Sequence, residues 1–272
     1  MVPAVPDGSQ RRAEGAPVTG PGAVAGTARL LVALDFDGTL SALVDDPMSA
    51  RMSAPAREAV DALLSAPDTV VALVSGRSLG DLRVISEHGD DSRILLAASH
   101  GAEFWIPGHP ADEVASAADL TLRDRLRGEA EALGADVPGS WIEPKSFGFG
   151  VHTRTVRESD AAARLHAQVD ELVAREAPSW RRRQGHNLVE YAFRTEGKDA
   201  AVARLRAETA ATAVVFAGDD VTDEDALRSL EPGDLGIRVG PGETAASVRV
   251  ADTNELAELL TTIARERAAA RQ

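Results

Sequence analysis

Short apolar runs alternate with amphipathic stretches in the first third of the chain. The runs at 30–34, 70–74 and 94–98 are separated by helical patterns at 55–65 and 79–87. An unbroken apolar run of about five residues is typical of a strand that is buried on both faces of a parallel sheet. Strands that alternate with helices favour an α/β fold with helices on both sides of that sheet.

The same alternation returns near the C-terminus. It predicts a helix at 199–209, a strand at 213–217, a helix at 223–230, a strand at 235–239 and a last helix at 254–271. We therefore expect one doubly wound, Rossmann-like parallel sheet. Its two halves are separated in the sequence and cover residues 28–106 and 196–272.

Residues 107–195 have a different pattern. Helices are predicted at 120–133 and 160–174, and each precedes a pair of strand-like segments, at 140–145 with 148–153 and at 179–183 with 187–193. Hairpin-like pairs of this kind indicate a small α/β domain inserted into the larger one as a cap.

Residues 1–27 are rich in Pro, Gly, Ala and Val and lack a basic segment followed by a long apolar one. This composition predicts a disordered tail rather than a secretory signal.

Composition excludes several classes of function. The chain has 272 residues, no cysteine and a formal net charge of −14, which exclude disulfides and thiolate chemistry and argue against nucleic-acid binding. The short basic run 181–183 is typical of a solvated strand edge. No apolar run approaches the ~20 residues of a membrane span. We expect a cytoplasmic monomer that acts on a small molecule.

Polar side chains follow the predicted strands at one end. Asp35 and Asp37 follow the first run, Ser75 follows the second, and Asp219 belongs to an acidic cluster after a later one. Lys198 begins a predicted helix. The carboxyl ends of parallel strands meet at one edge of the sheet, where ligands bind. Carboxylates for a cation, a hydroxyl and a lysine together suit a phosphate site, although an Asp-Gly turn by itself is common.

A second cluster lies in the predicted insertion. Glu143 and Lys145 are two residues apart on a predicted strand, so their side chains share a face, and Glu190 lies on a predicted neighbour. Carboxylates beside an amine suit the hydroxyls of a sugar. An exposed ion pair of little energetic value fits the same pattern.

The four core motifs together resemble the haloacid dehalogenase-like phosphohydrolase superfamily, and further strings resemble its trehalose-6-phosphate phosphatase family. The supporting strings are Asp35-Phe36-Asp37-Gly38-Thr39, Ser75-Gly76-Arg77, Ser99-His100-Gly101-Ala102-Glu103, Glu143-x-Lys145, His152-x-Arg154, Val189-Glu190, Lys198 and Gly218-Asp219-Asp220-x-Thr222-Asp223. The resemblance implies a hydrolase core with a cap that selects the substrate.

The resemblance also implies roles for the core residues. Asp35 is expected to be the nucleophile that forms an aspartyl-phosphate, and Asp37 the general acid and base. Ser75 and Lys198 are expected to bind the phosphoryl oxygens. Mg²⁺ is expected to be held by Asp35, the backbone carbonyl of Asp37 and Asp219. Asp220 and Asp223 are expected to orient these ligands from behind.

The implied substrate contacts come from both parts of the chain. Arg77 and His100 are expected where the core meets the cap, although His100 is equally compatible with a structural hydrogen bond. Glu143, Lys145 and Glu190 are expected to read glucose hydroxyls, with Arg154 near the phosphate.

Three positions depart from the family pattern. Thr153 replaces a frequent Tyr, Asp199 follows the motif lysine where Gly is usual, and His186 stands where a lysine is common. The last of these puts the contact from position 186 in doubt.

Two other interpretations of the function remain open. One is a phosphatase of another sugar phosphate, sucrose 6-phosphate or mannosyl-phosphoglycerate, and the other is a catalytically silent sugar-phosphate-binding domain.

Overall fold

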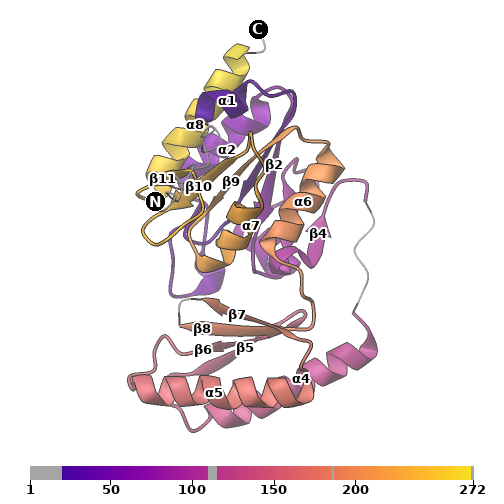
Figure 1. The fold of residues 1–272 in the computed structure, drawn as a ribbon, viewed down its shortest axis with the longest axis vertical. Helices are drawn as coiled ribbons and strands as arrows, with labels where there is room; N and C mark the ends of the chain where they lie inside the picture. The colour runs from indigo at the N-terminus through magenta and orange to yellow at the C-terminus, as the bar shows by residue number, and fades with distance from the viewer. Residues whose placement is uncertain (1–19, 110–114, 186, 271–272) are drawn as a thin grey trace, which may run out of the picture.

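The computed structural model describes residues 20–109, 115–185 and 187–270. Its larger sheet has seven strands in the order β11-β10-β9-β1-β2-β3-β4 (Figure 1). They are β1 (Leu30–Leu34), β2 (Thr69–Val74), β3 (Leu95–Ala98), β4 (Glu103–Trp105), β9 (Ala213–Gly218), β10 (Leu235–Val239) and β11 (Val248–Val250). All neighbours pair in parallel except β3 and β4. The predicted doubly wound α/β core is confirmed.

Helices cover both faces of this sheet (Figure 1). α1 (Pro21–Ala25), α2 (Ala54–Ser65), α3 (Leu79–Ile85) and α8 (Thr253–Ala270) pack on one face, and α6 (Lys198–Thr209) and α7 (Glu224–Ser229) pack on the other. Short 3₁₀ turns lie at η1 (Pro47–Ser49), η2 (Ser99–Gly101) and η3 (Val221–Asp223). Along β1, Leu30, Val32 and Leu34 join the first hydrophobic cluster and Leu31 and Ala33 join the second. Burial on both faces explains why this strand is an unbroken apolar run.

The register of the central strands places the polar motifs together. Leu34 is paired with Leu73 of β2 on one side and with Ala217 of β9 on the other. The residues that follow these positions therefore emerge at the same edge of the sheet.

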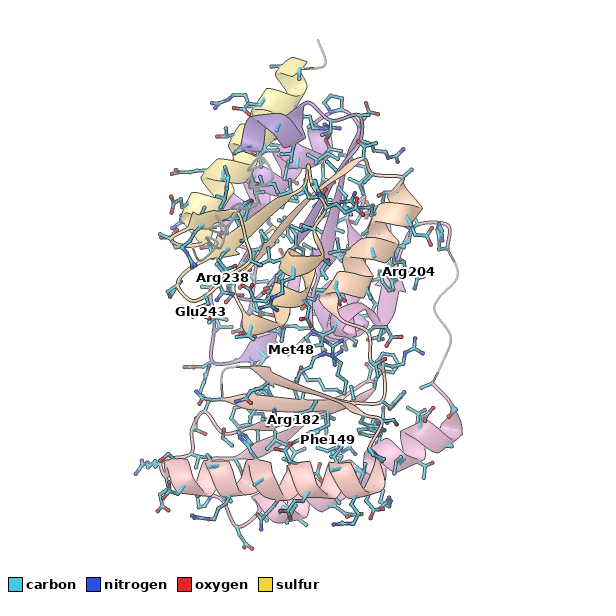
Figure 2. All side chains as sticks on the ribbon, in the orientation of Figure 1. Met48, Phe149, Arg182, Arg204, Arg238 and Glu243 are labelled. Carbon is cyan, nitrogen blue, oxygen red and sulfur yellow. The ribbon has the colours of Figure 1, made fainter. Side chains whose placement is uncertain are left out.

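A second sheet of four antiparallel strands is formed by the middle of the chain. Its order is β5-β6-β8-β7, with β5 (Trp141–Lys145), β6 (Gly148–His152), β7 (Arg181–Gly185) and β8 (Leu188–Ala192). The long helices α4 (Ala117–Gly134) and α5 (Ser159–Glu176) pack on one face around Phe149, labelled in Figure 2, and Leu165. The other face is turned toward the larger sheet (Figure 1). This face is therefore placed to complete a site at the carboxyl edge of β1.

The structure differs from the prediction in the segment before β1. The disordered tail predicted over residues 1–27 extends too far, because residues 21–25 form α1, where Val24 and Ala25 are buried. The Arg267 guanidinium of α8 donates to the carbonyls of Ala25 and Thr27 at 3.1 and 2.9 Å, which holds this segment against the last helix. Residues 1–19 lie outside the described part of the chain.

Some smaller elements were not predicted. β4 and β11 have three residues each and lie at the two edges of the sheet, too short for a hydrophobic period to mark them. α4 begins three residues before its predicted start, because Ser116 caps it by accepting a hydrogen bond from the Asp119 N–H. Among the described residues, no helix is both long and apolar enough to cross a membrane.

Candidate active site

A buried ion-pair cluster lies at the carboxyl edge of β1. Lys198, the first residue of α6, places Nζ 2.5 Å from Asp35 Oδ1 and 2.6 Å from Asp223 Oδ1. All three side chains are buried. Burial raises the pKa of Asp35 well above its usual value, and Asp223 and Asp219 add to this, while Lys198 opposes it. Burial alone would lower the pKa of Lys198, but the charges of Asp223 and Asp35 outweigh it and raise that pKa. The lysine therefore stays charged beside the predicted nucleophile.

Asp223 organises the acidic loop after β9. Its Oδ2 accepts hydrogen bonds from the N–H groups of Asp219 and Asp220 at 3.0 and 2.9 Å. A Cβ on Gly218 would lie 2.3 Å from Asp223 Cγ, so only glycine allows the loop to wrap around this carboxylate. The side chain of Asp223 is fully buried and does not line the cavity described below. Its geometry is that of a residue that supports the loop from behind.

Three carboxylates form a potential cation site. Oxygens of Asp35, Asp219 and Asp223 all lie within 4.8 Å of one another. Burial, followed by the charge of Asp223, raises the pKa of Asp219 to about 6. Thr39 Oγ1 lies 3.2 Å from Asp35 Oδ2, which orients that oxygen. The crowded charges of these carboxylates, with raised pKa values at Asp35 and Asp219, are what a hard divalent cation would neutralise. An all-oxygen donor set is the kind that such cations prefer. The residues present therefore fit a metal of this class.

Gly38 allows the turn that brings the first motif to this site. Its φ is 81°, a left-handed conformation that favours glycine, and a Cβ there would lie 2.0 Å from Asp219 Oδ2. The turn lets Asp219 approach the backbone that follows Asp35.

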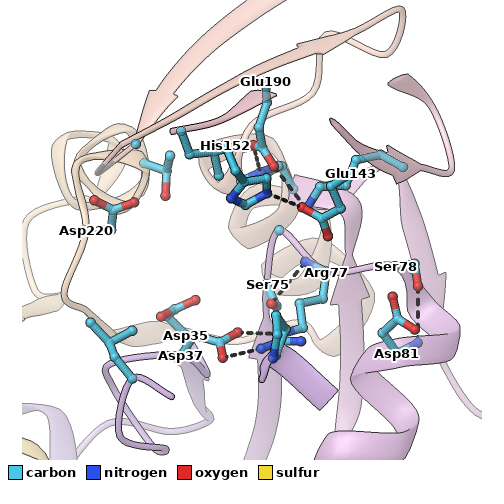
Figure 3. Close-up of a pocket in the computed structure, with 18 of the residues that line it drawn as sticks. Asp35, Asp37, Ser75, Arg77, Ser78, Asp81, Glu143, His152, Glu190 and Asp220 are labelled. Carbon is cyan, nitrogen blue, oxygen red and sulfur yellow. Dashed lines mark hydrogen bonds and ion pairs between the residues drawn. The ribbon is translucent and has the colours of Figure 1, made fainter. Parts of the chain in front are cut away.

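The side chain of Asp37 points toward Arg77 (Figure 3). Arg77 donates from Nε to Asp37 Oδ2 at 2.7 Å and from Nη2 to Asp37 Oδ1 at 2.6 Å, a two-pronged ion pair. Ser75 is buried at the end of β2, and its Oγ accepts from the Arg77 N–H at 3.2 Å. Asp37, Ser75 and Arg77 are thus brought together beside Asp35.

A second charged cluster lies on the second sheet. Lys145 Nζ is 3.0 Å from Glu143 Oε2 and 3.1 Å from Glu190 Oε1, and His152 Nε2 is 2.7 Å from Glu143 Oε2. Burial opposes ionisation of all three charged partners. Even so, the charge of Lys145 keeps the pKa of Glu190 below its usual value, the His152 hydrogen bond does so for Glu143, and Glu190 and Glu143 raise the pKa of Lys145. These are mutually supporting, largely buried charges rather than the exposed pair that the sequence pattern left open.

His100 joins the two sheets. Its Nε2 lies 3.0 Å from Glu190 Oε2, so the ring connects the η2 turn after β3 with β8. A Cβ on Gly76 would lie 2.6 Å from the His100 ring, so the glycine makes room for it. Burial lowers the pKa of His100, although Glu190 opposes this. A neutral His100 can donate to Glu190 and hold it in place.

A cavity of about 320 Å³ connects the two clusters. Figure 3 draws the charged groups of both sheets around it. Every predicted site residue except Asp223 lines it: Asp35, Asp37, Ser75, Arg77, His100, Glu143, Lys145, Arg154, Glu190, Lys198, Asp219 and Asp220. Arg154 forms an ion pair with Asp45 of the loop after β1 and is half-exposed at the rim. Thr153 is buried outside the cavity, and His186 lies outside the described residues.

Several lining residues were not among the predicted site residues. Among them are Leu43, Val44, Asp45, Trp141 and His152. His152 belongs to a string that pointed to the family, and its partly buried position beside Glu143 could have been found from strand pairing. The loop residues 43–45 carry no signal, because only the approach of the second sheet turns them into part of a wall.

Comparison with known proteins agrees with this geometry. A profile of the family described as trehalose-phosphatase matches residues 33–258. The chain is similar to a trehalose-phosphate phosphatase of Mycobacterium marinum, at 34% identity over 260 residues, 86% of this chain and 63% of that protein. It is 29% identical over 235 residues to a trehalose-6-phosphate phosphatase of Escherichia coli, which covers 84% of this chain and 85% of that protein.

Solved structures show the same fold. The C-terminal domain of a Candida albicans trehalose-6-phosphate phosphatase superposes with a TM-score of 0.77 at 22% identity, covering 90% of this chain and 95% of that one. A trehalose-6-phosphate phosphatase related protein gives 0.72 at 26% identity, covering 86% and 97%. The chain spans less than two thirds of the length of the first mycobacterial relatives. The family match extends over most of the chain and takes in both sheets, so this protein belongs to the trehalose-phosphatase family.

Proposed function

We propose that this chain hydrolyses trehalose 6-phosphate to trehalose and phosphate. One observation carries the proposal: a single cavity joins the Asp35–Lys198–Asp219 group to the Glu143–Lys145–Glu190 group. The first group suits a phosphoryl centre and the second suits sugar hydroxyls. A phosphorylated sugar is the substrate class that needs both at once.

Asp35 is proposed as the nucleophile. One of its oxygens would form a bond to phosphorus while the bond from phosphorus to the sugar oxygen breaks. Water would then attack phosphorus, and the bond between Asp35 and phosphorus would break to release phosphate. Lys198, which already contacts Asp35, would stay charged throughout and offset the negative charge of the transferring group.

Asp37 is proposed to move the protons. It would give a proton to the sugar oxygen as that oxygen leaves, and it would later take a proton from the attacking water. Both oxygens of Asp37 accept hydrogen bonds from Arg77. A substrate phosphate offers Arg77 a second anion, so we propose that Arg77 turns to it and frees Asp37 for proton transfer. Ser75 would donate its hydroxyl to a phosphoryl oxygen.

Mg²⁺ is the proposed cation. Asp35, Asp219 and the backbone carbonyl of Asp37 would hold it, with Asp220 and Asp223 supporting the loop that carries Asp219. The cation would neutralise the converging carboxylates and withdraw charge from the phosphoryl oxygens.

The second sheet with α4 and α5 is proposed to be a cap that selects the substrate, formed by residues 107–195 and inserted between two core segments, 28–106 and 196–272. Glu143, Lys145 and Glu190 would bind sugar hydroxyls, and Arg154 would contribute from the rim. Specificity among sugar phosphates would depend on these contacts, and each is worth a modest energy difference.

Phosphate release from a panel of substrates tests this function. The panel holds trehalose 6-phosphate, sucrose 6-phosphate, glucose 6-phosphate and mannosyl-phosphoglycerate, each assayed with Mg²⁺ and with EDTA. We expect Mg²⁺-dependent release with a preference for trehalose 6-phosphate. Release from another member alone would keep the core chemistry and reject the substrate. Binding of trehalose 6-phosphate without any release would identify a silent sugar-phosphate-binding domain.

A further inference from the structure

Trp141 presents an indole ring to the cavity at the end of the charged cluster on the second sheet. It is the first residue of β5, it lines the cavity, and 42% of its surface is exposed. Exposure of such a large apolar side chain carries information that an exposed small one does not, since it leaves apolar area in water. Trp141 is therefore a candidate for contact with a ligand.

The indole is held in place by its neighbours. Trp141 pairs with His152 in the register of β5 and β6, and their rings stack with centroids 4.2 Å apart and an angle of 7° between planes. His152 is in turn held by Glu143 through the 2.7 Å contact of its Nε2. A ring fixed in this way loses little conformational entropy when a ligand packs on it.

Trp141, Glu143 and Lys145 lie on alternate positions of β5, so they share the face that is turned to the cavity. Contacts run from the indole through His152 and Glu143 to Lys145, Glu190 and His100. His100 approaches Gly76, beside Ser75 of the phosphoryl site. These contacting side chains form a polar row across the cavity wall. The indole is therefore at the end of this row that is remote from the reacting phosphate.

The loop after β1 adds apolar surface to the same cavity. Leu43 is 71% exposed and Val44 36%, and both line it. Arg154, two residues beyond His152, pairs with Asp45 of this loop, so the loop reaches the part of the second sheet where Trp141 and His152 stack. The cavity thus combines a charged end for phosphate, a polar row and an aromatic end.

A pyranose ring matches this arrangement. Its hydroxyls point outward around the ring edge, and its C–H groups form apolar patches on the two faces. We infer that Trp141, backed by His152, is the platform on which the C–H face of the unphosphorylated sugar ring packs, while the polar row binds hydroxyls. The inference rests on the proposed function. It makes Trp141 the residue that favours a disaccharide phosphate over a monosaccharide phosphate as substrate.

Kinetics of Trp141→Ala on two substrates test the assignment. A contact that is equal in the ground and transition states raises KM and leaves kcat unchanged. We expect kcat/KM for trehalose 6-phosphate to fall about tenfold or more, mainly through KM, as for other lost apolar contacts. We expect a change below about twofold for glucose 6-phosphate, which has no second ring, and an intermediate loss in Trp141→Phe. Equal losses on both substrates would overturn the inference.

Tryptophan fluorescence provides a readout that does not depend on turnover. The chain has three tryptophans, so Trp105→Phe/Trp180→Phe leaves Trp141 as the sole emitter. We expect a saturable emission change when trehalose is added, and none when glucose is added at the same concentration. The matched control, Trp105→Phe/Trp141→Phe, keeps only Trp180. This side chain packs against Phe149 and Phe193, between the second sheet and its helices, and it should not respond.

The two experiments separate failure of this inference from failure of the proposed function. If the enzyme hydrolyses a different disaccharide phosphate of the panel, the titration is repeated with the corresponding free sugar, and a response of Trp141 alone supports the platform. If no member of the panel is hydrolysed, the trehalose titration still decides. A silent Trp141, or an equal response of Trp180, would overturn the inference.

Discussion

Arg77 holds both carboxylate oxygens of Asp37, at 2.7 and 2.6 Å. The pair joins the turn after β2 to the turn after β1 and is only partly exposed. A guanidinium fork matches a carboxylate and a phosphate equally well. The same arginine can therefore position Asp37 before substrate arrives and bind the phosphate afterwards.

We expect Arg77→Ala to lower kcat/KM for the preferred sugar phosphate about 100-fold, as the loss of one strong oxyanion ligand does elsewhere. Arg77→Lys should recover only part of this, because an ammonium does not reproduce the two-pronged contact. The matched control is Arg57→Ala on α2, which removes an exposed ion pair with Glu87 after α3. A loss of the same size in the control, or wild-type kinetics in Arg77→Ala, would contradict the assignment.

Asp35→Asn should abolish turnover and leave the protein folded. The pKa of Asp35 is raised mainly by burial, so the ionised carboxylate is costly in place and a neutral amide of equal size is tolerated. Lys198 keeps Asp223 as its ion-pair partner in this variant, so no buried charge is left unpaired. We expect the free energy of unfolding to change by less than about 1 kcal/mol. Phosphate release and urea unfolding measure the two effects. Near-normal turnover in this variant would remove Asp35 from the role of nucleophile.

Lys198→Met should destabilise the protein as well as inactivate it. Removing the ammonium leaves two buried carboxylates, Asp35 and Asp223, facing each other without a cation. Breaking a buried ion pair from one side costs about 3 kcal/mol or more. The double variant Lys198→Met/Asp223→Asn should regain part of this stability but none of the activity. If the single variant is as stable as wild type, the ion-pair cluster does not contribute to folding as we infer.

Removal of divalent cations should be visible without any substrate. A ligand that binds only the folded state at about 100 times its Kd stabilises it by about 2.7 kcal/mol, so Mg²⁺ should raise the Tm and EDTA should reverse the rise. Asp219→Asn should abolish this response. It should not destabilise the metal-free protein, because burial and Asp223 raise the pKa of Asp219 to about 6 and make its charge costly at neutral pH. Asp61→Asn on the exposed side of α2 is the control. A normal Mg²⁺ response in Asp219→Asn would place the cation elsewhere.

The burial of His100 between the two sheets leads us to expect that the free energy of unfolding depends on pH. Burial lowers the pKa of His100 in the folded state, so the unfolded chain binds a proton more readily. Stability from this group should be fully present above its unfolded pKa of about 6.5 and should decline as pH falls below that value. Urea unfolding at about pH 7.5 and 5.5 should show a smaller decline in His100→Asn than in wild type. His109→Gln, on the exposed end of the β4 loop, should decline like wild type. A steeper decline in His100→Asn would reverse the sign of the argument.

The apolar runs determined the core of this protein. Burial on both faces requires an unbroken run such as residues 30–34, and a strand that ends in Asp35 must deliver that carboxylate to the edge of the sheet. Local rules of this kind also identified Ser75 and Asp219 as neighbours of Asp35. The period of two along a strand likewise grouped Glu143 with Lys145 and placed Glu190 on a neighbouring strand, and in the structure Lys145 contacts both carboxylates. The family strings added the expected role of this group.

Only the tertiary structure decided which partners these groups take. Lys198 meets Asp35 across 163 residues, Arg77 captures Asp37, and His100 reaches Glu190 on the second sheet. The packing of Trp141 on His152 and the burial of α1 against α8 depend in the same way on contacts between distant segments. A hydrophobic period reports which face of an element is buried, because side chains two apart on a strand, or three and four apart on a helix, lie on the same face. It carries no information about what is packed against that face, and ion pairing, pKa values and cavity walls all depend on the latter.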